Sequence, residues 1–192
     1  MSHDISAEVP DDRNRLVVLP SERDYRQGEL DARVVLVEYG DYQCPYCGEL
    51  YTLIKTIQEQ PNAIFPEEID LCFVFRQFPQ PLIHPQAQKA AAAALAAGVQ
   101  GQFWQMHEML FSHQQELGNG YLVEYADRLE LDIPRFLQDI TREIHLDRIN
   151  QDIESGIQSG VTIAPALFIN GMRYIDRWNM EQLVTAIVTA NH

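Results

Sequence analysis

Two cysteines three positions apart, Cys44 and Cys47, stand in the segment DYQCPYCGEL at residues 41–50. Such a pair serves as a dithiol–disulfide couple, as half of a metal site, or as two unreactive core thiols. Structural zinc needs four ligands, and neither Cys72 nor any of the six histidines stands at ligand spacing from another ligand. The sequence therefore favours redox chemistry, with no metal and no cofactor beyond the cysteines themselves.

The residues around the pair predict its place in the fold. VVLVEY at 34–39 is typical of a buried strand that ends at Gly40. Pro45 suits the first position of a helix, where a missing N–H costs nothing, and the helical pattern continues to Pro61. A helix N-terminus offers free N–H groups and a partial positive charge. We therefore expect a stabilised thiolate and a lowered pKa at Cys44.

The two thiols have different roles in this interpretation. Cys44 attacks a substrate disulfide, and Cys47, one turn further along the helix, resolves the mixed disulfide. Pro45 and Tyr46 are expected to tune the couple, because they decide which backbone N–H groups face the sulfur. Cys72 follows an apolar strand pattern and is expected to be a core residue.

Glu38 is a carboxylic acid in an otherwise apolar strand. A strand buried on both faces should be apolar throughout, and a buried acid tends to take up a proton. We expect Glu38 to accept the proton of Cys47 during resolution. The alternative is that Glu38 reaches water at the edge of the strand. His84 also has two interpretations, a residue at the edge of the active site or a helix cap.

The order of elements predicts an α/β protein with the thioredoxin fold. A β-α-β unit is followed by helical patterns from residue 79 to about 141, and then by a longer helix that stops at Ser159-Gly160. The strands ALFIN and RYI follow, joined by the hairpin signal Asn170-Gly171, and a closing helix covers 180–189. Without the helical block the order is β-α-β … α-β-β-α, so we predict an all-helical insertion at 79–141, after the second strand.

The predicted domain covers 31–192 and follows an acidic N-terminal extension at 1–30, in which LVVL at 16–19 is a candidate short edge strand. The chain has a net charge of −14 and only two lysines. Nucleic acids and anionic membranes attract positively charged surfaces, so both are disfavoured as partners. No run approaches the roughly eighteen apolar residues of a membrane span.

Three features favour a cytoplasmic protein. The first fifteen residues carry acids where a secretory signal has basic residues, and no apolar run of signal length follows them. Three cysteines are too few for a disulfide scaffold.

The chain resembles the DsbA-like thioredoxin-fold oxidoreductases, especially the cytosolic-type members with a VEYGDYQCPYC segment. The resemblance covers about residues 30–190. It rests on three blocks in the same order: the strand Glu with CPYC at 38–47, the FRQFP–HP–Q–A–A–G–FW–MH–LF run from Arg76 to Phe111, and GV–P–LFING at 160–171.

The resemblance implies roles for individual residues. Cys44 is the nucleophile, Cys47 the resolving thiol and Glu38 the buried acid. Pro165 is the cis-proline that faces the disulfide, and Ala164 before it offers backbone hydrogen bonds to a bound substrate chain. With Pro45 and Tyr46, Ala164 makes up the expected substrate contacts.

The chain departs from the family at the cis-proline. Related members commonly have Gly-Thr-Pro-Thr where this chain has Ile163-Ala164-Pro165-Ala166, so no side chain at 164 can hydrogen-bond near the sulfurs.

The expected function is that of a thiol–disulfide oxidoreductase acting on protein or peptide disulfides. In a reducing cytosol we expect it to reduce or reshuffle them, with glutathione or the thioredoxin system as electron donor. The alternative is a redox-sensing or metal-binding regulatory module on the same fold, without turnover.

Overall fold

The computed structural model describes residues 14–66 and 68–192, so residues 1–13 of the predicted extension lie outside the described residues. The strands are β1 (Tyr25–Gln27), β2 (Val34–Gly40), β3 (Leu71–Gln77), β4 (Ala166–Ile169) and β5 (Met172–Arg173). The helices are α1 (Pro45–Glu59), α2 (Pro61–Ile64), α3 (Ala87–Gly98), α4 (Phe103–Ser112), α5 (Asn119–Arg128), α6 (Ile133–Thr141), α7 (Leu146–Gln158) and α8 (Met180–Asn191).

The described strands form one mixed sheet in the order β1-β3-β2-β4-β5. β2 pairs in parallel with β3 and antiparallel with β4, which places Glu38 between Phe75 and Leu167. This inner position explains the apolar sequence of β2, because both of its faces are covered. The predicted thioredoxin fold is confirmed, including the β-α-β unit of β2, α1 and β3.

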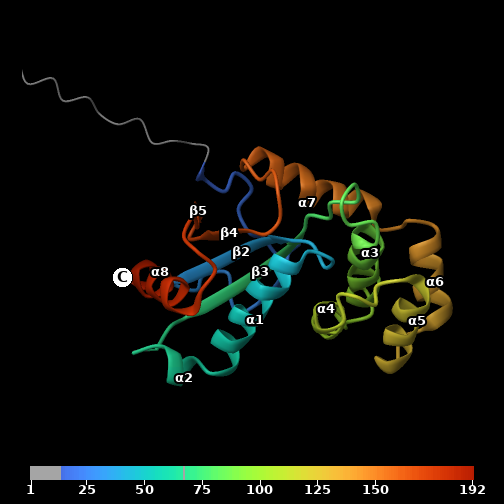
Figure 1. Ribbon diagram of the computed structural model, residues 1–192, viewed down its shortest axis with the longest axis horizontal. Helices are drawn as coiled ribbons and strands as arrows, with labels where there is room; N and C mark the ends of the chain where they lie inside the picture. The colour runs from blue at the N-terminus through green and yellow to red at the C-terminus, as the bar shows by residue number, and fades with distance from the viewer. Residues whose placement is uncertain (1–13, 67) are drawn as a thin grey trace, which may run out of the picture.

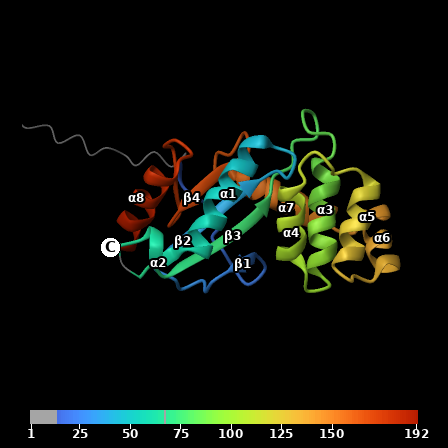
Figure 2. The same ribbon diagram turned by 60° about the horizontal axis from the view of Figure 1, so that its bottom comes forward.

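Helices cover both faces of the sheet (Figure 1). α1 and α8 lie on one face, whereas α7 lies on the other, where the hydroxyl of Tyr39 bonds to that of Ser155 at 2.8 Å. α3 to α6 stand together beyond one end of the sheet, the end at which β2 passes into α1 (Figure 2). The alanines between residues 90 and 97 are almost all buried, and their small side chains allow α3 to pack closely among its neighbours.

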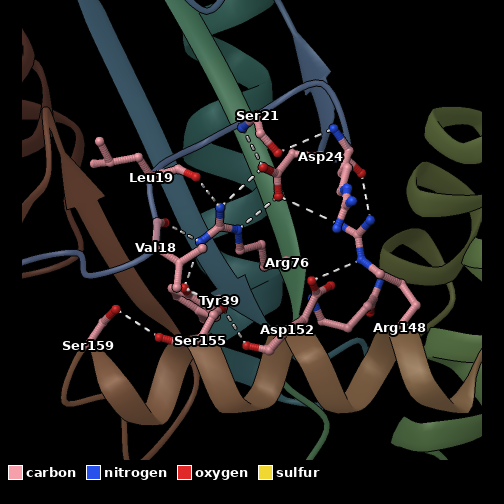
Figure 3. Close-up of polar contacts among 12 residues, drawn as sticks. Val18, Leu19, Ser21, Asp24, Tyr39, Arg76, Arg148, Asp152, Ser155 and Ser159 are labelled. Carbon is pink, nitrogen blue, oxygen red and sulfur yellow. Dashed lines mark hydrogen bonds and ion pairs between the residues drawn. The ribbon is translucent and has the colours of Figure 1, made fainter.

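One buried arginine is the main polar anchor of residues 18–24 of the N-terminal segment against the sheet (Figure 3). Arg76 donates to the carbonyls of Val18 and Leu19, at 2.7 and 3.2 Å, and to both carboxylate oxygens of Asp24, at 2.9 and 3.1 Å. The predicted strand at 16–19 is therefore wrong. Two of its carbonyls accept from a side chain and are not available for a strand ladder. The segment forms an isolated bridge from Arg15 to Met172 and a bond from the N–H of Leu16 to the carbonyl of Gly171, and the edge strands of the sheet are β1 and β5.

The C-terminal hairpin turns at Asn170-Gly171, as predicted. Both residues have left-handed backbone conformations, with φ of 48° and 79°, which the preferred two-residue hairpin turn requires. The second strand of the hairpin covers Met172–Arg173, shorter and earlier than the predicted RYI. Tyr174 still donates its N–H to the carbonyl of Leu167, but Ile175 is 78% exposed.

Over the part of the chain that the structure describes, no helix combines the length and the apolar character needed to cross a membrane.

Candidate active site

The cysteine pair lies where β2 passes into α1. Cys44 is the N-cap of α1 and Pro45 is the first helical residue, which confirms the predicted start of the helix. Cys44 donates its N–H to the carbonyl of Asp41 at 3.1 Å, and its own carbonyl accepts from Gly48 at 3.2 Å. The backbone of Cys44 is therefore bonded on both sides.

Cys44 has the properties of the attacking thiol. A hydrogen bond from the Cys47 thiol, supported by the N–H groups of Cys47 and Tyr46, lowers the pKa of Cys44 to about 6, although burial works in the opposite direction. As a thiol, Cys44 donates to the carbonyl of Ala164 at 3.6 Å. At neutral pH the sulfur is therefore mostly a thiolate, the nucleophilic form.

Cys47 lies beneath it and has the opposite properties. Its side chain is fully buried, and its sulfur accepts from the N–H of Asp41 at 3.4 Å. Burial raises the pKa of Cys47 well above its usual value, and the hydrogen bond to Cys44 and the charge of Glu38 add to the effect. Cys47 thus holds its proton until a base removes it. Both cysteines are free thiols, and so is the buried Cys72.

Glu38 is a buried carboxylic acid on the inner strand β2. It is 1% exposed, and its Oε1 has no hydrogen-bond partner. Burial raises the pKa of Glu38 to about 8, and the charge of Cys44 adds to this. The alternative of an acid at the sheet edge is wrong, because β2 is an inner strand.

A cavity of about 570 Å³ lies beside Glu38, between α1 and α4. Tyr51, Trp104 and His107 also line it. Burial lowers the pKa of His107 to about 3, so this imidazole is neutral, and its Nδ1 lies 3.0 Å from the hydroxyl of Tyr42. His107 lies among the buried residues of α4 and belongs to the core.

The loop before β4 completes the site opposite Cys44. The Ala164–Pro165 peptide bond is cis. Ala164 is buried, whereas Pro45 and Tyr46, on the other side of the sulfur, are exposed. The structure thus brings together all seven residues that the sequence singled out: Glu38, Cys44, Pro45, Tyr46, Cys47, Ala164 and Pro165.

A family model described as thioredoxin matches residues 21–188, which is most of the chain. The chain belongs to the thioredoxin family.

Several solved structures share its fold at lower sequence identity. BdbD from Bacillus subtilis, in its oxidised form, is 21% identical with a TM-score of 0.77, and the match covers 93% of this chain and 98% of BdbD. α-DsbA1 from Wolbachia pipientis is 19% identical with a TM-score of 0.76, covering 91% and 94%. The catalytic domain of ScsC from Proteus mirabilis is 22% identical with a TM-score of 0.69, covering 88% and 89%. The predicted resemblance to DsbA-like proteins is confirmed.

Curated relatives with higher identity are much longer proteins. The chain is 37% identical over 175 residues to the Na⁺/H⁺ antiporter NhaA 1 of Salinispora arenicola and to the Na⁺/H⁺ antiporter NhaA 3 of Salinispora tropica. Each match covers 91% of this chain and 26% of the relative. The chain thus spans about a quarter of the length of these antiporters.

Asp41 is a polar residue of this thioredoxin-family site that the sequence did not indicate. Its carboxylate is buried and accepts from the N–H of Gln43 at 2.8 Å and from that of Gln80 at 2.9 Å. It also lies 2.9 Å from Nδ1 of His84. The interpretation of His84 as a helix cap is wrong, because the N-cap of α3 is Gln86, and its contact with Asp41 places it at the edge of the site.

Gln80 and Gln114 were missed as well. Gln80 accepts the N–H of Ala164 through Oε1 at 3.1 Å, and Gln114 donates to the carbonyls of Tyr42 and Cys44 at 2.9 and 2.8 Å. Both glutamines stand in connecting segments, where no periodic pattern marks them. The one sequence signal that could have pointed to Gln80 is its place in the FRQFP–HP block, between proline residues and close to His84.

Metal binding was the other chemistry considered for the cysteines. Among residues 14–66 and 68–192, no group of three or more His, Cys, Asp or Glu side chains is placed to hold an ion. A tetrahedral zinc site on Cys44 and Cys47 would need two further ligands.

Proposed function

We propose that this chain is a thiol–disulfide oxidoreductase that exchanges disulfides of proteins or peptides through Cys44 and Cys47. The observation that carries the proposal is the difference between the two sulfurs. Hydrogen bonding lowers the pKa of Cys44 to about 6, whereas burial raises the pKa of Cys47. One thiol is thus ready to attack, and the other is held back until the mixed disulfide has formed.

The first step forms a mixed disulfide. The Cys44 thiolate attacks one sulfur of the substrate disulfide, a bond forms between the two sulfurs, and the other substrate sulfur leaves as a thiolate that takes up a proton. Cys44 begins as a thiolate, so no base is needed for this step.

The second step resolves it. Cys47 gives its proton to the carboxylate of Glu38 and attacks Sγ of Cys44, the bond between Cys44 and the substrate breaks, and the second substrate sulfur leaves as a thiolate that takes up a proton. The substrate is then a dithiol, and the enzyme holds the Cys44–Cys47 disulfide. Glu38 suits this role because its pKa, raised by burial to about 8, allows it to accept and to release a proton near neutral pH. A thiol donor, glutathione or the thioredoxin system, returns the pair to the dithiol.

The stabilised thiolate bears on the direction of exchange. A lowered pKa of Cys44 stabilises the reduced form of the pair. An isomerase rests in the reduced form, so of the two expected roles we favour the reshuffling of disulfides over net reduction. We propose the cytoplasm as the compartment, because it supplies the thiol donor and the chain has few cysteines, one of them the free, buried Cys72.

The reduction potential of the pair tests this proposal. The protein is equilibrated in graded glutathione buffers, and free thiols are counted by alkylation and mass. A value above about −220 mV supports the isomerase, and a value at or below it supports a reductase. Failure to form the disulfide at any ratio would refute redox function. Turnover is then measured as reduction of insulin disulfides, with Cys44→Ser as the inactive control.

The antiporter relatives favour a second candidate function. In each antiporter, a region similar to 91% of this chain makes up about a quarter of the protein. In this alternative, the domain is a regulatory module that senses redox state beside an ion transporter. A pair that oxidises and reduces reversibly without turning over insulin or peptide disulfides would favour it. Stoichiometric zinc in protein purified without chelator would favour a metal-binding module instead.

A further inference from the structure

Ala164 carries backbone groups that a bound substrate chain would use, and its N–H is occupied by a side chain of the protein itself. Its N–H donates to Oε1 of Gln80 at 3.1 Å, whereas its carbonyl, 3.6 Å from Sγ of Cys44, accepts from that sulfur only in the thiol form and is free when Cys44 is a thiolate. The residue itself is only 4% exposed. An extended peptide that pairs with a backbone edge needs free N–H and C=O groups. The side chain of Gln80 must therefore leave before a substrate chain can pair with this N–H.

We propose that Gln80 competes with the substrate for Ala164. Its side-chain carbonyl takes the place of a substrate backbone carbonyl at the N–H of Ala164, and an incoming chain binds by replacing it. This inference rests on the proposed function, exchange with peptide disulfides. Gln80 acts through Ala164 and not on the reacting sulfurs, so it determines specificity and affinity and is not a catalytic residue.

The main chain of Gln80 is held in place, so the exchange requires only a side-chain rotation. Its N–H donates to the buried carboxylate of Asp41 at 2.9 Å. Its carbonyl accepts from Ile83 and His84, at 3.0 and 2.8 Å, and His84 in turn lies 2.9 Å from the same Asp41 carboxylate. The side chain of Gln80 is partly exposed and can turn into solvent while these bonds remain.

Exposed apolar side chains flank the contact that the substrate would take over. Leu82 is fully exposed and Ile83 is 60% exposed, in the turn that starts at Gln80. Ile163, directly before Ala164, is 56% exposed, and Tyr46, two residues after Cys44, is 62% exposed. Burial of these side chains favours binding. The substrate that fits is an extended peptide with apolar side chains on both sides of its cysteine.

Steady-state exchange with such a peptide disulfide tests the inference. The variants are Gln80→Ala, Gln80→Met, which keeps the length without the acceptor, and the matched control Gln138→Ala on the exposed side of α6. Both Gln80 variants should lower the KM for the peptide about three- to tenfold, the factor that one net hydrogen bond is worth. The kcat and the alkylation rate of Cys44 by iodoacetamide should stay within about twofold of wild type, and Gln138→Ala should change none of these values.

Two results would contradict the inference, and they are distinguishable. If the wild type exchanges the peptide but neither Gln80 variant lowers its KM, Gln80 does not compete with the substrate. A raised KM would show that Gln80 instead holds the loop in its productive position. If the wild type itself does not exchange the peptide, the proposed function fails, and this inference fails with it.

Discussion

The backbone N–H of Asp41 donates to the sulfur of Cys47 over 3.4 Å, and the carbonyl of the same residue accepts from the N–H of Cys44 over 3.1 Å. One residue of the loop after β2 thus contacts both cysteines of the pair. Its N–H partly stabilises charge on Cys47, but burial outweighs this and the pKa of Cys47 stays raised. The contrast between the two sulfurs therefore depends on the fold around them.

The first prediction concerns the thiolate of Cys44. Because a hydrogen bond from Cys47 is the main cause that lowers the pKa of Cys44 to about 6, Cys47→Ala should raise this pKa. The measurement is the pH dependence of Cys44 alkylation, or of thiolate absorbance. Cys72→Ala is the control and should leave the titration of Cys44 unchanged. A wild-type midpoint near 9, the ordinary value, would contradict the assignment of the nucleophile.

The second prediction concerns the proton of Cys47. If Glu38 is its acceptor, resolution of a preformed mixed disulfide on Cys44 should accelerate as the pH rises through about 8, where Glu38 becomes a carboxylate. In Glu38→Gln this rise should disappear, and resolution should slow by about 10²-fold or more at neutral pH. Quenched-flow measurement of substrate release checks it. An unchanged rate and pH profile in the variant would exclude Glu38 as the base.

The same carboxyl predicts a pH-dependent stability. Burial raises the folded-state pKa of Glu38 from 4.5 to about 8, so on a rise in pH the unfolded chain loses this proton first. Below about pH 4.5 the protonated Glu38 contributes its full stabilisation to the folded state. This stabilisation is lost progressively as the pH rises from about 4.5 to about 8. At pH 8 Glu38→Gln should therefore be more stable than wild type, by at most about 5 kcal/mol. Urea unfolding should show the two proteins converging at pH 4.5; a constant difference across this range would contradict the shift.

A fourth prediction uses Gly48 in the first turn of α1. A Cβ there would lie 2.2 Å from Oε1 of Gln114, and Nε2 of the same side chain donates to the carbonyls of Tyr42 and Cys44. Gly48→Ala should displace this side chain and cost about 1–3 kcal/mol of unfolding free energy, since two hydrogen bonds are lost. The control is Gly120→Ala in α5, where a Cβ meets nothing within 4 Å and should stabilise the helix slightly. Equal effects on Tm would show that Gln114 does not hold the loop.

The fifth prediction concerns the buried ion pair that holds the N-terminal segment. Arg76 and Asp24 have side chains that are 3% and 4% exposed. Arg76→Met removes the closest cationic partner of the buried carboxylate, which then keeps only Arg148 at 3.7 Å and the N–H of Ser21, and should cost about 3–5 kcal/mol. The matched control, Arg128→Met, breaks an exposed pair with Glu124 and should cost under about 1 kcal/mol. Denaturant unfolding of both variants compares them; similar losses would mean that the buried network does not hold the segment.

Elements with local signals were predicted from the sequence. Pro45 marked the start of α1, and Asn170-Gly171 marked the hairpin, because backbone conformations at these positions follow from residue type. Glu38 was recognised because a carboxyl in an apolar strand is a local contradiction. Local signals failed for the strand at 16–19, since the carbonyls there bond to Arg76, which is more than fifty residues away.

The amino-acid sequence by itself determined the cysteine pair, its place at a helix N-terminus and the order of the elements. Only the tertiary structure decided what surrounds the pair. Gln80 reaches Ala164 across 84 residues of sequence, and Gln114 reaches Cys44 across 70. Residue type and periodicity report the conformation of neighbours along the chain, whereas a hydrogen bond between two loops depends on where the packed sheet and helices place their ends.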